Sequence, residues 1–177
     1  TGATHGNEYL NIVDRLPKAL MQSPNKSLLK FLQRGGSVFF VPVLNPDGYD
    51  ARRRANAKGV DLNRDWPNPG NGQKPSKQIE NIALASWISK YVEKTGVKVS
   101  KVVDYHCCVS GALLLPWGYK KGEYMSEADA ERSAHFQKIF KNSFKKPGKV
   151  GTPPDILYSA TGTTLDYWYD KYSAVSF

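Results

Sequence analysis

Apolar residues recur along this chain with two kinds of spacing, and the alternation between them predicts its secondary structure. Apolar positions three to four residues apart are typical of amphipathic helices, whereas short runs of β-branched and aromatic residues favour strands. The expected helices cover residues 8–20, 27–33, 77–94 and 126–145, and a further one begins at 165. The expected strands cover residues 37–43, 98–105 and 172–177.

Proline and glycine positions refine these boundaries. Pro17 is expected to kink or shorten the first helix, because proline removes a backbone donor. Gly35 and Gly36 close the second helix, and a loop rich in Gly, Pro and Lys is expected over 145–154. On the helix over 77–94, the apolar face carries Ile79, Ile82, Ala83, Ser86, Trp87 and Val92.

Strands that alternate with helices indicate an α/β fold in which helices cover both faces of a sheet. No linker, repeat or low-complexity segment interrupts the chain, so residues 1–177 are expected to form a single domain. In such sheets ligands bind beyond the carboxyl ends of the strands. His5, the segment after Val43 and His106 are therefore expected at that edge.

The longest stretch without regular periodicity covers residues 44–76. A loop of this length in a compact domain is usually functional or disordered. It begins with the turn sequence Asn-Pro-Asp-Gly and continues with the run Arg52, Arg53 and Arg54. Asn63 and Arg64 follow in the same stretch, which is therefore a candidate for binding an anion.

The composition is that of a globular protein, with 40% hydrophobic residues and a net charge of +9. Such a charge is compatible with an anionic partner and equally with solubility alone. Aromatic and basic residues do not interleave in a nucleic-acid-binding pattern, so no nucleic-acid partner is expected. No apolar run within residues 1–177 has membrane-spanning length. No signal peptide is expected in these residues, and the start at Thr1 without Met is compatible with a removed leader.

The strongest chemical signal is a histidine and a glutamate three positions apart. His5 and Glu8 stand at the start of an apolar-periodic stretch, which places them one turn apart on one side of a helix. Imidazole and carboxylate both bind zinc, and a catalytic zinc takes three protein ligands and leaves a position for water. His106, at the end of a predicted strand, is the candidate third ligand. A surface His beside a Glu favoured by the helix dipole is the alternative interpretation.

The cysteines of the chain, Cys107 and Cys108, directly follow this third candidate ligand. Adjacent cysteines rarely bond to each other, so no disulfide framework is expected. We interpret both as small, buried residues beside the site rather than as metal ligands.

Four separated stretches, in order along the chain, resemble the zinc carboxypeptidases of the M14 family, carboxypeptidase A type. They are T-H-G-N-E-Y near the start, N-P-D-G-Y with the later G-V-D-L-N-R over 45–64, D-Y-H-C-C over 104–108, and L-Y-S-A-T-G-T-T-L-D-Y-W-Y over 157–169. The resemblance implies a three-layer α/β fold, with a mixed sheet and helices on both faces. It also implies one zinc ion, a peptide C-terminus as substrate, and secretion or a periplasmic location. It leaves the oligomeric state open.

The resemblance also implies roles for individual residues. His5, Glu8 and His106 correspond to the zinc ligands, and Asp61 to an acid that orients the first zinc histidine. Asn63 and Arg64 correspond to the residues that hold the terminal carboxylate of the substrate, for which a guanidinium fork is suited. The remaining correspondences are Arg54 with the residue that stabilises the oxyanion, Tyr158 with the tyrosine that closes over substrate, Leu165 with the specificity residue, and Asp166 with a structural acid.

The chain departs from the family pattern at its end. The family's general base is a Glu on the strand after the last helix, and no Glu follows Tyr158 in this chain. Fewer strands are also expected before His5 than the family has. We therefore interpret the chain as a truncated domain, cut at both ends, with exposed sheet edges that favour aggregation. A positioned base contributes ~10²–10⁴-fold, so the chain by itself is expected to have severely reduced activity.

Several functional hypotheses follow. The first is a carboxypeptidase with a preference for apolar or aromatic C-terminal residues, as Leu165 suggests. The second is a bacterial enzyme of the same fold that acts on cell-wall peptides next to diaminopimelate, with which the short separation of Glu8 and His106 is compatible. The third is a fragment that binds zinc and a peptide without activity.

Overall fold

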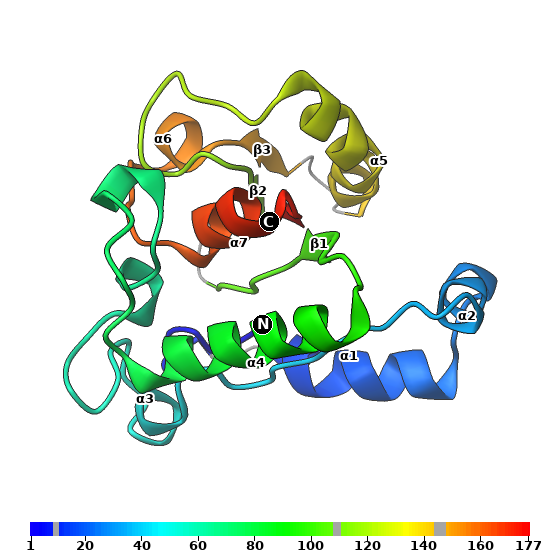
Figure 1. The fold of residues 1–177 in the computed structure, drawn as a ribbon, viewed down its shortest axis with the longest axis horizontal. Helices are drawn as coiled ribbons and strands as arrows, with labels where there is room; N and C mark the ends of the chain where they lie inside the picture. The colour runs from blue at the N-terminus through cyan, green and yellow to red at the C-terminus, as the bar shows by residue number, and fades with distance from the viewer. Residues whose placement is uncertain (9–10, 108–110, 144–147) are drawn as a thin grey trace.

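The computed structural model describes residues 1–8, 11–107, 111–143 and 148–177, and Figure 1 shows their arrangement. The helices are α1 (Asn11–Gln22), α2 (Lys26–Gln33), α3 (Pro46–Asp50), α4 (Ile79–Thr95), α5 (Glu127–Asn142), α6 (Pro153–Ile156) and α7 (Thr164–Tyr172). Two 3₁₀ turns, η1 (Leu62–Arg64) and η2 (Pro69–Asn71), lie between α3 and α4. The strands are β1 (Lys101–Val102), β2 (Ala112–Leu114), β3 (Lys149–Gly151) and β4 (Val175–Ser176).

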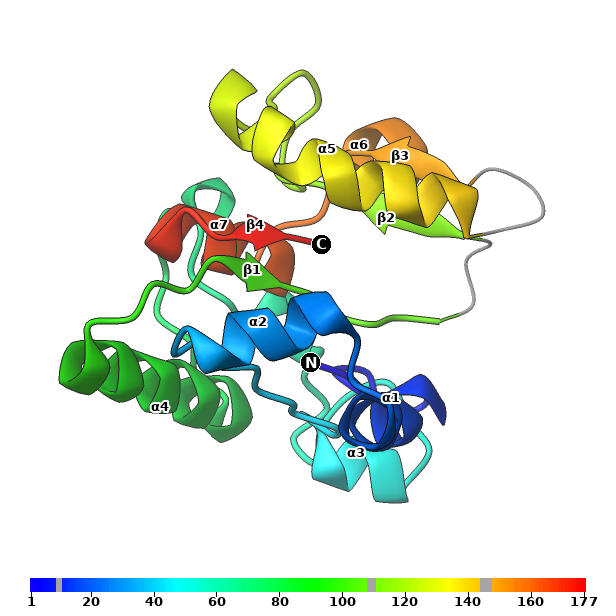
Figure 2. The ribbon, with the colours of Figure 1, turned by 90° about the vertical axis from the view of Figure 1, so that its right-hand side faces the viewer.

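These strands form two separate parallel pairs. β1 pairs with β4, with Lys101 opposite Val175, and β2 pairs with β3, with Leu113 opposite Val150. Figure 2 shows α5 on one side of the strands and α4 on the other, which is the layering expected for an α/β fold. An isolated parallel bridge between Gly2 and Tyr105 brings the start of the chain beside the segment that follows β1.

Helix α7 lies at the centre of the molecule. All of its first six residues, from Thr164 to Tyr169, are buried. One side of the helix contributes Tyr167 and Trp168 to an apolar cluster completed by Leu44, Leu62, Trp66 and Ala174. A second cluster forms where Phe136 and Phe140 of α5 pack on Leu113, Val175 and Phe177. The end of the chain therefore contributes to both clusters, through α7 to the first and through Val175 and Phe177 to the second.

Residues 37–43, predicted as a buried strand, are not a regular strand in the structure. The Val41 carbonyl accepts a hydrogen bond from Gly2 and the Leu44 N–H donates to the Gly2 carbonyl, so one edge of the segment is paired. The side chains of Val38, Phe39 and Phe40 are 43%, 44% and 39% exposed. β-rich composition favours a pleated surface with neighbours, and these three side chains lack full packing against the described residues.

Helix α4 was predicted correctly, but its apolar face turns outward. Ile79 is 65% exposed and Trp87 is 46% exposed, whereas Leu84, Ala85 and Ile88 pack on the core. The inward face is set by the fully buried Asn81, whose amide donates to the Leu62 carbonyl at 2.9 Å and to Asp65 at 3.3 Å. The hydrogen bonds of the Asn81 NH₂ group thus keep a polar residue on the inward face of α4, which the apolar pattern did not predict.

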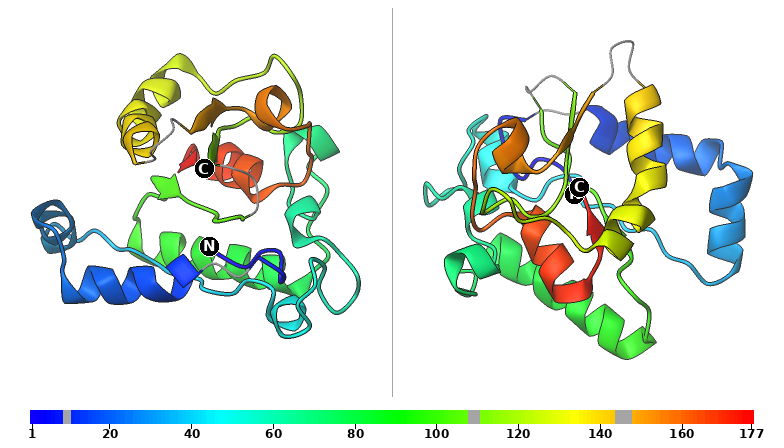
Figure 3. Two further views of the ribbon diagram at one scale, coloured as in Figure 1. Left: turned by 180° about the vertical axis from the view of Figure 1, so that it is seen from behind. Right: turned by 90° about the horizontal axis from the view of Figure 1, so that it is seen from above.

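Other boundaries also differ from the expectation. α1 continues through Pro17 to Gln22, so the proline does not shorten the helix. The predicted loop over 145–154 contains β3 and the start of α6. α2, predicted correctly, lies at the edge of the molecule away from α7 (Figure 3), and none of its residues is buried.

Asp166 in the first turn of α7 predicts a pH dependence of stability. Its side chain is fully buried, Oδ1 accepts from the Gly118 N–H at 2.7 Å, and Oδ2 has no hydrogen-bond partner among the described residues. Burial raises the pKa of this carboxyl from 3.8 to about 7. Between these values the unfolded chain ionises while the folded chain keeps its proton, so Asp166 makes stability fall as pH rises, by at most ~1.4 kcal/mol per pH unit.

Asp166→Asn is accordingly expected to flatten the fall in stability between about pH 4 and 7. The amide keeps an acceptor for Gly118 and cannot ionise. Urea unfolding of both proteins at pH 5 and pH 7 measures the effect, with Asp50→Asn on the exposed end of α3 as control. An equal pH dependence in the parent chain and the Asp166 variant would show that this carboxyl is ionised in the folded state.

Candidate metal centre

His5 and Glu8 lie in a tight turn that precedes α1. The Glu8 N–H donates to the His5 carbonyl at 3.0 Å, whereas α1 begins at Asn11. The prediction that both residues lie on a helix is therefore wrong. A Cβ at Gly6 would lie 1.9 Å from the backbone of Gly48, so only glycine allows this turn to press against α3. In this turn, as in a helix, residues three positions apart lie side by side. His5 and Glu8 are therefore brought together although they do not lie on a helix.

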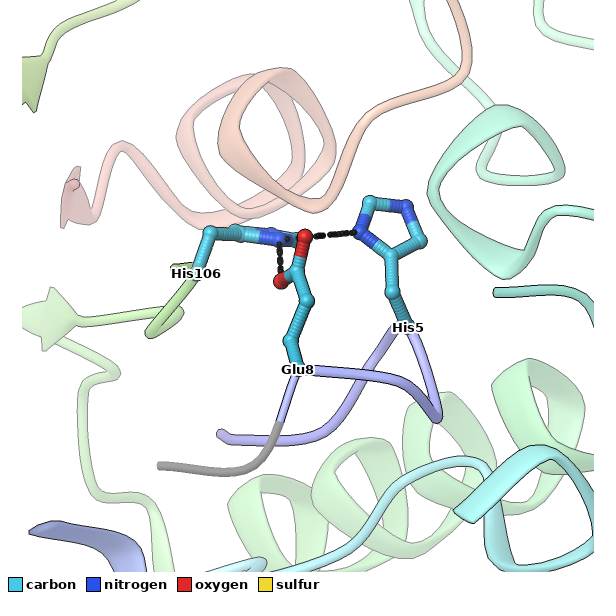
Figure 4. A group of neighbouring side chains, drawn as sticks. All are labelled: His5, Glu8 and His106. Carbon is cyan, nitrogen blue, oxygen red and sulfur yellow. Dashed lines mark hydrogen bonds and ion pairs between the residues drawn. The ribbon is translucent and has the colours of Figure 1, made fainter. Parts of the chain in front are cut away.

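Three side chains from distant parts of the chain converge here (Figure 4). His5 Nδ1 lies 2.9 Å from Glu8 Oε1, and His106 Nδ1 lies 2.7 Å from Glu8 Oε2. The two Nδ1 atoms are 3.2 Å apart. His106 reaches the turn because the neighbouring Tyr105 is bridged to Gly2.

The outer nitrogen of each ring faces an aspartate. His5 Nε2 lies 2.9 Å from Asp61 Oδ1, and His106 Nε2 lies 3.1 Å from Asp104 Oδ2. In a neutral imidazole this arrangement puts the proton on Nε2 and leaves the Nδ1 lone pair for a metal. Two imidazole nitrogens and one carboxylate, all within 4.8 Å of one another, fit a zinc ion that keeps an open position.

The charges of the cluster are strongly coupled in the absence of a metal. Burial opposes ionisation of Glu8, but hydrogen bonds from His106 and His5 outweigh it and lower the pKa of Glu8 to about 2. Burial likewise opposes protonation of His106, but Asp104 and Glu8 raise its pKa to about 10. The cluster therefore holds a proton between its nitrogen and oxygen atoms, and a bound metal ion would take the place of that proton.

Asp61 joins this cluster to the irregular segment 44–76. It caps η1 by accepting from the Asn63 N–H at 2.9 Å. Its Oδ2 accepts from Arg54 Nε at 2.9 Å and lies 2.8 Å from Arg54 Nη2. Arg54 Nη1 also lies 3.2 Å from His5 Nδ1. The guanidinium of Arg54 is thus held at the edge of the cluster by the same carboxylate that orients His5.

Asn63, Arg64 and Tyr158 form a second polar group beside the cluster. The Thr164 N–H donates to Asn63 Oδ1 at 2.9 Å, so the amide NH₂ of Asn63 is turned the other way. Arg64 Nη2 donates to the Tyr158 hydroxyl at 3.3 Å, and the Tyr158 side chain is 58% exposed. The backbone at Gly162 packs closely against the backbone of Arg64, because a Cβ at Gly162 would lie 2.3 Å from the Arg64 carbonyl oxygen.

A cleft of about 780 Å³ brings nearly all of the predicted site residues together. Among the residues that line it are His5, Glu8, Arg54, Asn63, Arg64, His106, Tyr158 and Leu165. Asp61 lies behind His5 and does not line the cleft. An apolar end of the cleft was not predicted from the sequence, and it is formed by Val103, Leu113, Phe136, Phe140 and Phe177.

Two further polar residues, Asp104 and Thr164, were also missed by the sequence analysis. Both line the cleft, and they are hydrogen-bonded to each other. A signal for Asp104 exists in the sequence, because alternate residues of an extended segment point to the same side and Asp104 stands two before His106.

Cys107 differs from the expectation in its bonding state. Cys107 lines the cleft, and its N–H donates to Glu8 Oε2 at 3.4 Å. Cys107 is disulfide-bonded, contrary to the expectation that the cysteines form no disulfide framework. Cys108 lies outside the described residues.

In the part of the chain that the structure describes, no helix has the length and apolarity to cross a membrane.

Known proteins resemble this chain in sequence and in fold. Rat (Rattus norvegicus) carboxypeptidase A2 is 29% identical over 77% of the chain, which spans 39% of that protein. The inactive metallocarboxypeptidase ECM14 of Ajellomyces capsulatus is 28% identical over 67% of the chain, which spans 24% of that protein. Bovine thrombin-activatable fibrinolysis inhibitor, solved in complex with tick carboxypeptidase inhibitor, matches 98% of the chain with a TM-score of 0.73 at 22% identity, and 68% of that structure is covered.

The chain thus spans less than two fifths of the length of the curated relatives described above. The likeness to the bovine structure confirms the α/β fold class. The family model for zinc carboxypeptidases matches residues 1–177. Together with the His, Glu, His cluster at the heart of the cleft, this match shows that the chain belongs to the zinc carboxypeptidase family.

Proposed function

We propose that this chain supplies the zinc-binding and carboxylate-binding parts of a carboxypeptidase, which hydrolyses the C-terminal peptide bond of peptides with an apolar or aromatic last residue. The observation that carries the proposal is the convergence of His5, Glu8 and His106 in one cleft with Asn63 and Arg64. A metal centre beside a pair of carboxylate-binding groups fits a substrate with a free C-terminus.

The three clustered side chains would hold one zinc ion. When bound, zinc acts as a Lewis acid and lowers the pKa of a coordinated water. His5 is kept in the required tautomer by Asp61, whose carboxylate accepts from Nε2. The position and the proton of the ring are thus fixed before metal arrives.

Arg54 is placed to stabilise negative charge on the scissile carbonyl oxygen. Its guanidinium lies at the edge of the cluster, with Nη1 3.2 Å from His5 Nδ1, and the side chain is 45% exposed to the cleft and solvent. Asp61 fixes its Nε and Nη2, so the charge does not need to reorganise when the oxyanion forms.

Asn63 and Arg64 would hold the terminal carboxylate of the substrate. The Asn63 amide is oriented by the Thr164 N–H, which leaves its NH₂ as a donor. The guanidinium carbon of Arg64 lies 5.9 Å from the centre of the exposed Tyr158 ring. Arg64 would therefore both bind the substrate carboxylate and contact Tyr158 when that side chain closes over the substrate. Both residues donate, as a carboxylate requires.

The cleft favours an apolar side chain at the substrate's last position. Leu165 is buried, and the same cleft is also lined by Pro153, Leu157, Ala160, Ala112 and Leu114. Among the described residues of the lining, the acids are Glu8 and Asp104, both taken up by histidines. A Lys, Arg or diaminopimelate side chain would therefore find no free carboxylate in the described part of the cleft.

Binding of N-acetyl amino acids to the zinc-loaded chain tests this proposal. N-acetyl-phenylalanine is expected to bind more tightly than its C-terminal amide and more tightly than N-acetyl-lysine or N-acetyl-diaminopimelate. Arg64→Gln is expected to weaken binding of N-acetyl-phenylalanine by about 2 kcal/mol, or roughly 30-fold, because a charge-assisted hydrogen bond is lost. Arg53→Gln, at an exposed position on the same segment, is the control.

Titration calorimetry gives the dissociation constants. Equal affinity for the acid and the amide would contradict a carboxylate-binding role for Arg64. A preference for diaminopimelate would favour an enzyme of cell-wall peptides instead.

A role in zinc and peptide binding without turnover is the second candidate. It is favoured by the absence of a free acid in the described lining of the cleft, where Glu8 and Asp104 both contact His106. Turnover by the chain itself separates the two candidates.

A further inference from the structure

Asp104 is a buried carboxylate surrounded by hydrogen-bond donors. Its side chain is 4% exposed. Oδ2 lies 3.1 Å from His106 Nε2 and accepts from Thr164 Oγ1 at 2.7 Å. Thr4 Oγ1 lies 3.0 Å from Oδ1 and 3.1 Å from Oδ2, and the Thr1 hydroxyl also donates to Oδ1. Because every one of these partners can donate, the site suits an ionised carboxylate, which accepts at both oxygens.

Thr164 connects Asp104 to Asn63. It is the first residue of α7, is 2% exposed, and gives its hydroxyl proton to Asp104. Its main-chain N–H donates to Asn63 Oδ1 at 2.9 Å, which decides which end of the Asn63 amide is the acceptor. One residue therefore holds two others through two separate atoms.

The proton positions around His106 are consistent with this arrangement. Asn63 Nδ2 lies 3.3 Å from His106 Nε2. With the proton of His106 on Nε2 and directed to Asp104, both of these nitrogens are donors and do not bond to each other. The Asn63 NH₂ thus stays available on the cleft side, and His106 Nδ1, which faces Glu8, is left for the metal.

We propose that Asp104 and Thr164 are positioning residues that tie the metal centre to the carboxylate-binding amide, Asp104 by fixing the His106 ring and Thr164 by fixing Asp104 and Asn63 together. The inference rests on the proposed zinc site. Asp104 would serve His106 as Asp61 serves His5, so both imidazoles are oriented by a carboxylate. Asp104 differs from Asp61 in that it also bonds to Thr164 on α7, the helix that carries Leu165.

Zinc affinity of variants, measured by competition with a chromogenic chelator, tests the inference. Asp104→Asn presents an NH₂ group to donors, and it is expected to raise the zinc dissociation constant about 10- to 100-fold. Thr164→Val keeps the shape and the main-chain N–H but removes one hydrogen bond to a charged group, so a rise of roughly 10-fold is expected. Thr164→Ser retains a hydroxyl and is expected to restore most of the affinity.

A double-mutant cycle separates this link from two independent defects. If Thr164 acts through Asp104, the double variant Asp104→Asn, Thr164→Val is expected to bind zinc no more weakly than Asp104→Asn alone. Asp50→Asn is the matched control for the change of Asp to Asn at an exposed position. The NMR signal of the His106 Nε2 proton in the zinc-loaded chain adds a structural readout, and it is expected to exchange faster with water in Thr164→Val.

Unchanged zinc affinity in Asp104→Asn, or fully additive effects in the cycle, would overturn the inference while leaving the zinc site in place. If Asp104→Asn does not fold, the Thr164→Val affinity and the Nε2 proton signal decide, and no change in either overturns it. Failure of the unsubstituted chain to bind zinc would instead overturn the proposed function, and this inference with it.

Discussion

Replacing His106 by alanine is expected to weaken zinc binding by the chain more than about 100-fold. Loss of an outer partner of a metal ligand costs ~10–100-fold, and loss of the ligand itself costs more. In the structure His106 Nδ1 faces both His5 Nδ1 and Glu8 Oε2. Removal of His106 leaves two zinc ligands where zinc takes three or four. Glu8 would also lose a partner that holds its carboxylate in place.

The measurement is zinc affinity by chelator competition, with thermal unfolding in the absence of metal to check that each variant folds. His135→Ala provides a matched control, because His135 is exposed on α5 away from the cleft. Equal zinc affinity in the His106 variant and the parent chain would show that zinc binds elsewhere. A loss of affinity in the His135 variant would point to the same conclusion.

The zinc-loaded chain by itself is expected to release C-terminal phenylalanine from a peptide with a turnover number below about 0.1 s⁻¹. A typical enzyme turns over at about 10 s⁻¹, and a positioned general base accounts for ~10²–10⁴-fold of such rates. The described lining of the cleft offers two acids, of which Glu8 contacts both histidines and Asp104 is held by threonines and His106. Neither is free to take a proton from water.

Release of phenylalanine is followed by mass spectrometry with and without a zinc chelator, after the intact mass of the sample is verified. His106→Ala reports any release that does not depend on the metal centre. Chelator-sensitive turnover near 10 s⁻¹ would contradict the expectation and would mean that one of the cleft's own acids, or a residue outside the described part, acts as the base. Release at the same low rate with chelator would favour a role in binding alone.

The elements with strong helical periodicity were predictable from the sequence. α2, α4, α5 and α7 all lie within a few residues of their expected positions. The orientation of α4 was not predictable, because periodicity shows which residues share a face and not which face turns inward. Asn81, a residue that an apolar pattern ignores, turns α4 by its hydrogen bonds to Leu62 and Asp65.

Strands were harder to predict, because a strand depends on its neighbours. The run over 37–43 has the composition of a strand, but its described backbone bonds go to Gly2 along one edge. Conversely, β3 lies in a stretch rich in Gly, Pro and Lys, where pairing with β2 gives an extended conformation that composition does not predict.

The cluster of His5, Glu8 and His106 was predictable because ligand types and their resemblance to known motifs are local features of the sequence. The support around it was less so. Asp104 and Thr164 are 60 positions apart, and their hydrogen bond exists because α7 begins beside the segment that follows β1. Such contacts depend on topology, and a motif of a few residues does not contain them.

The most direct test is anomalous diffraction at the zinc edge from crystals of the zinc-loaded chain. We expect one strong peak about 2.0–2.2 Å from His5 Nδ1, His106 Nδ1 and the Glu8 carboxylate, with both Nε2 atoms still bonded to Asp61 and Asp104. No peak between these three side chains, or a zinc ion bound through either Nε2, would contradict the metal centre on which the proposed function rests.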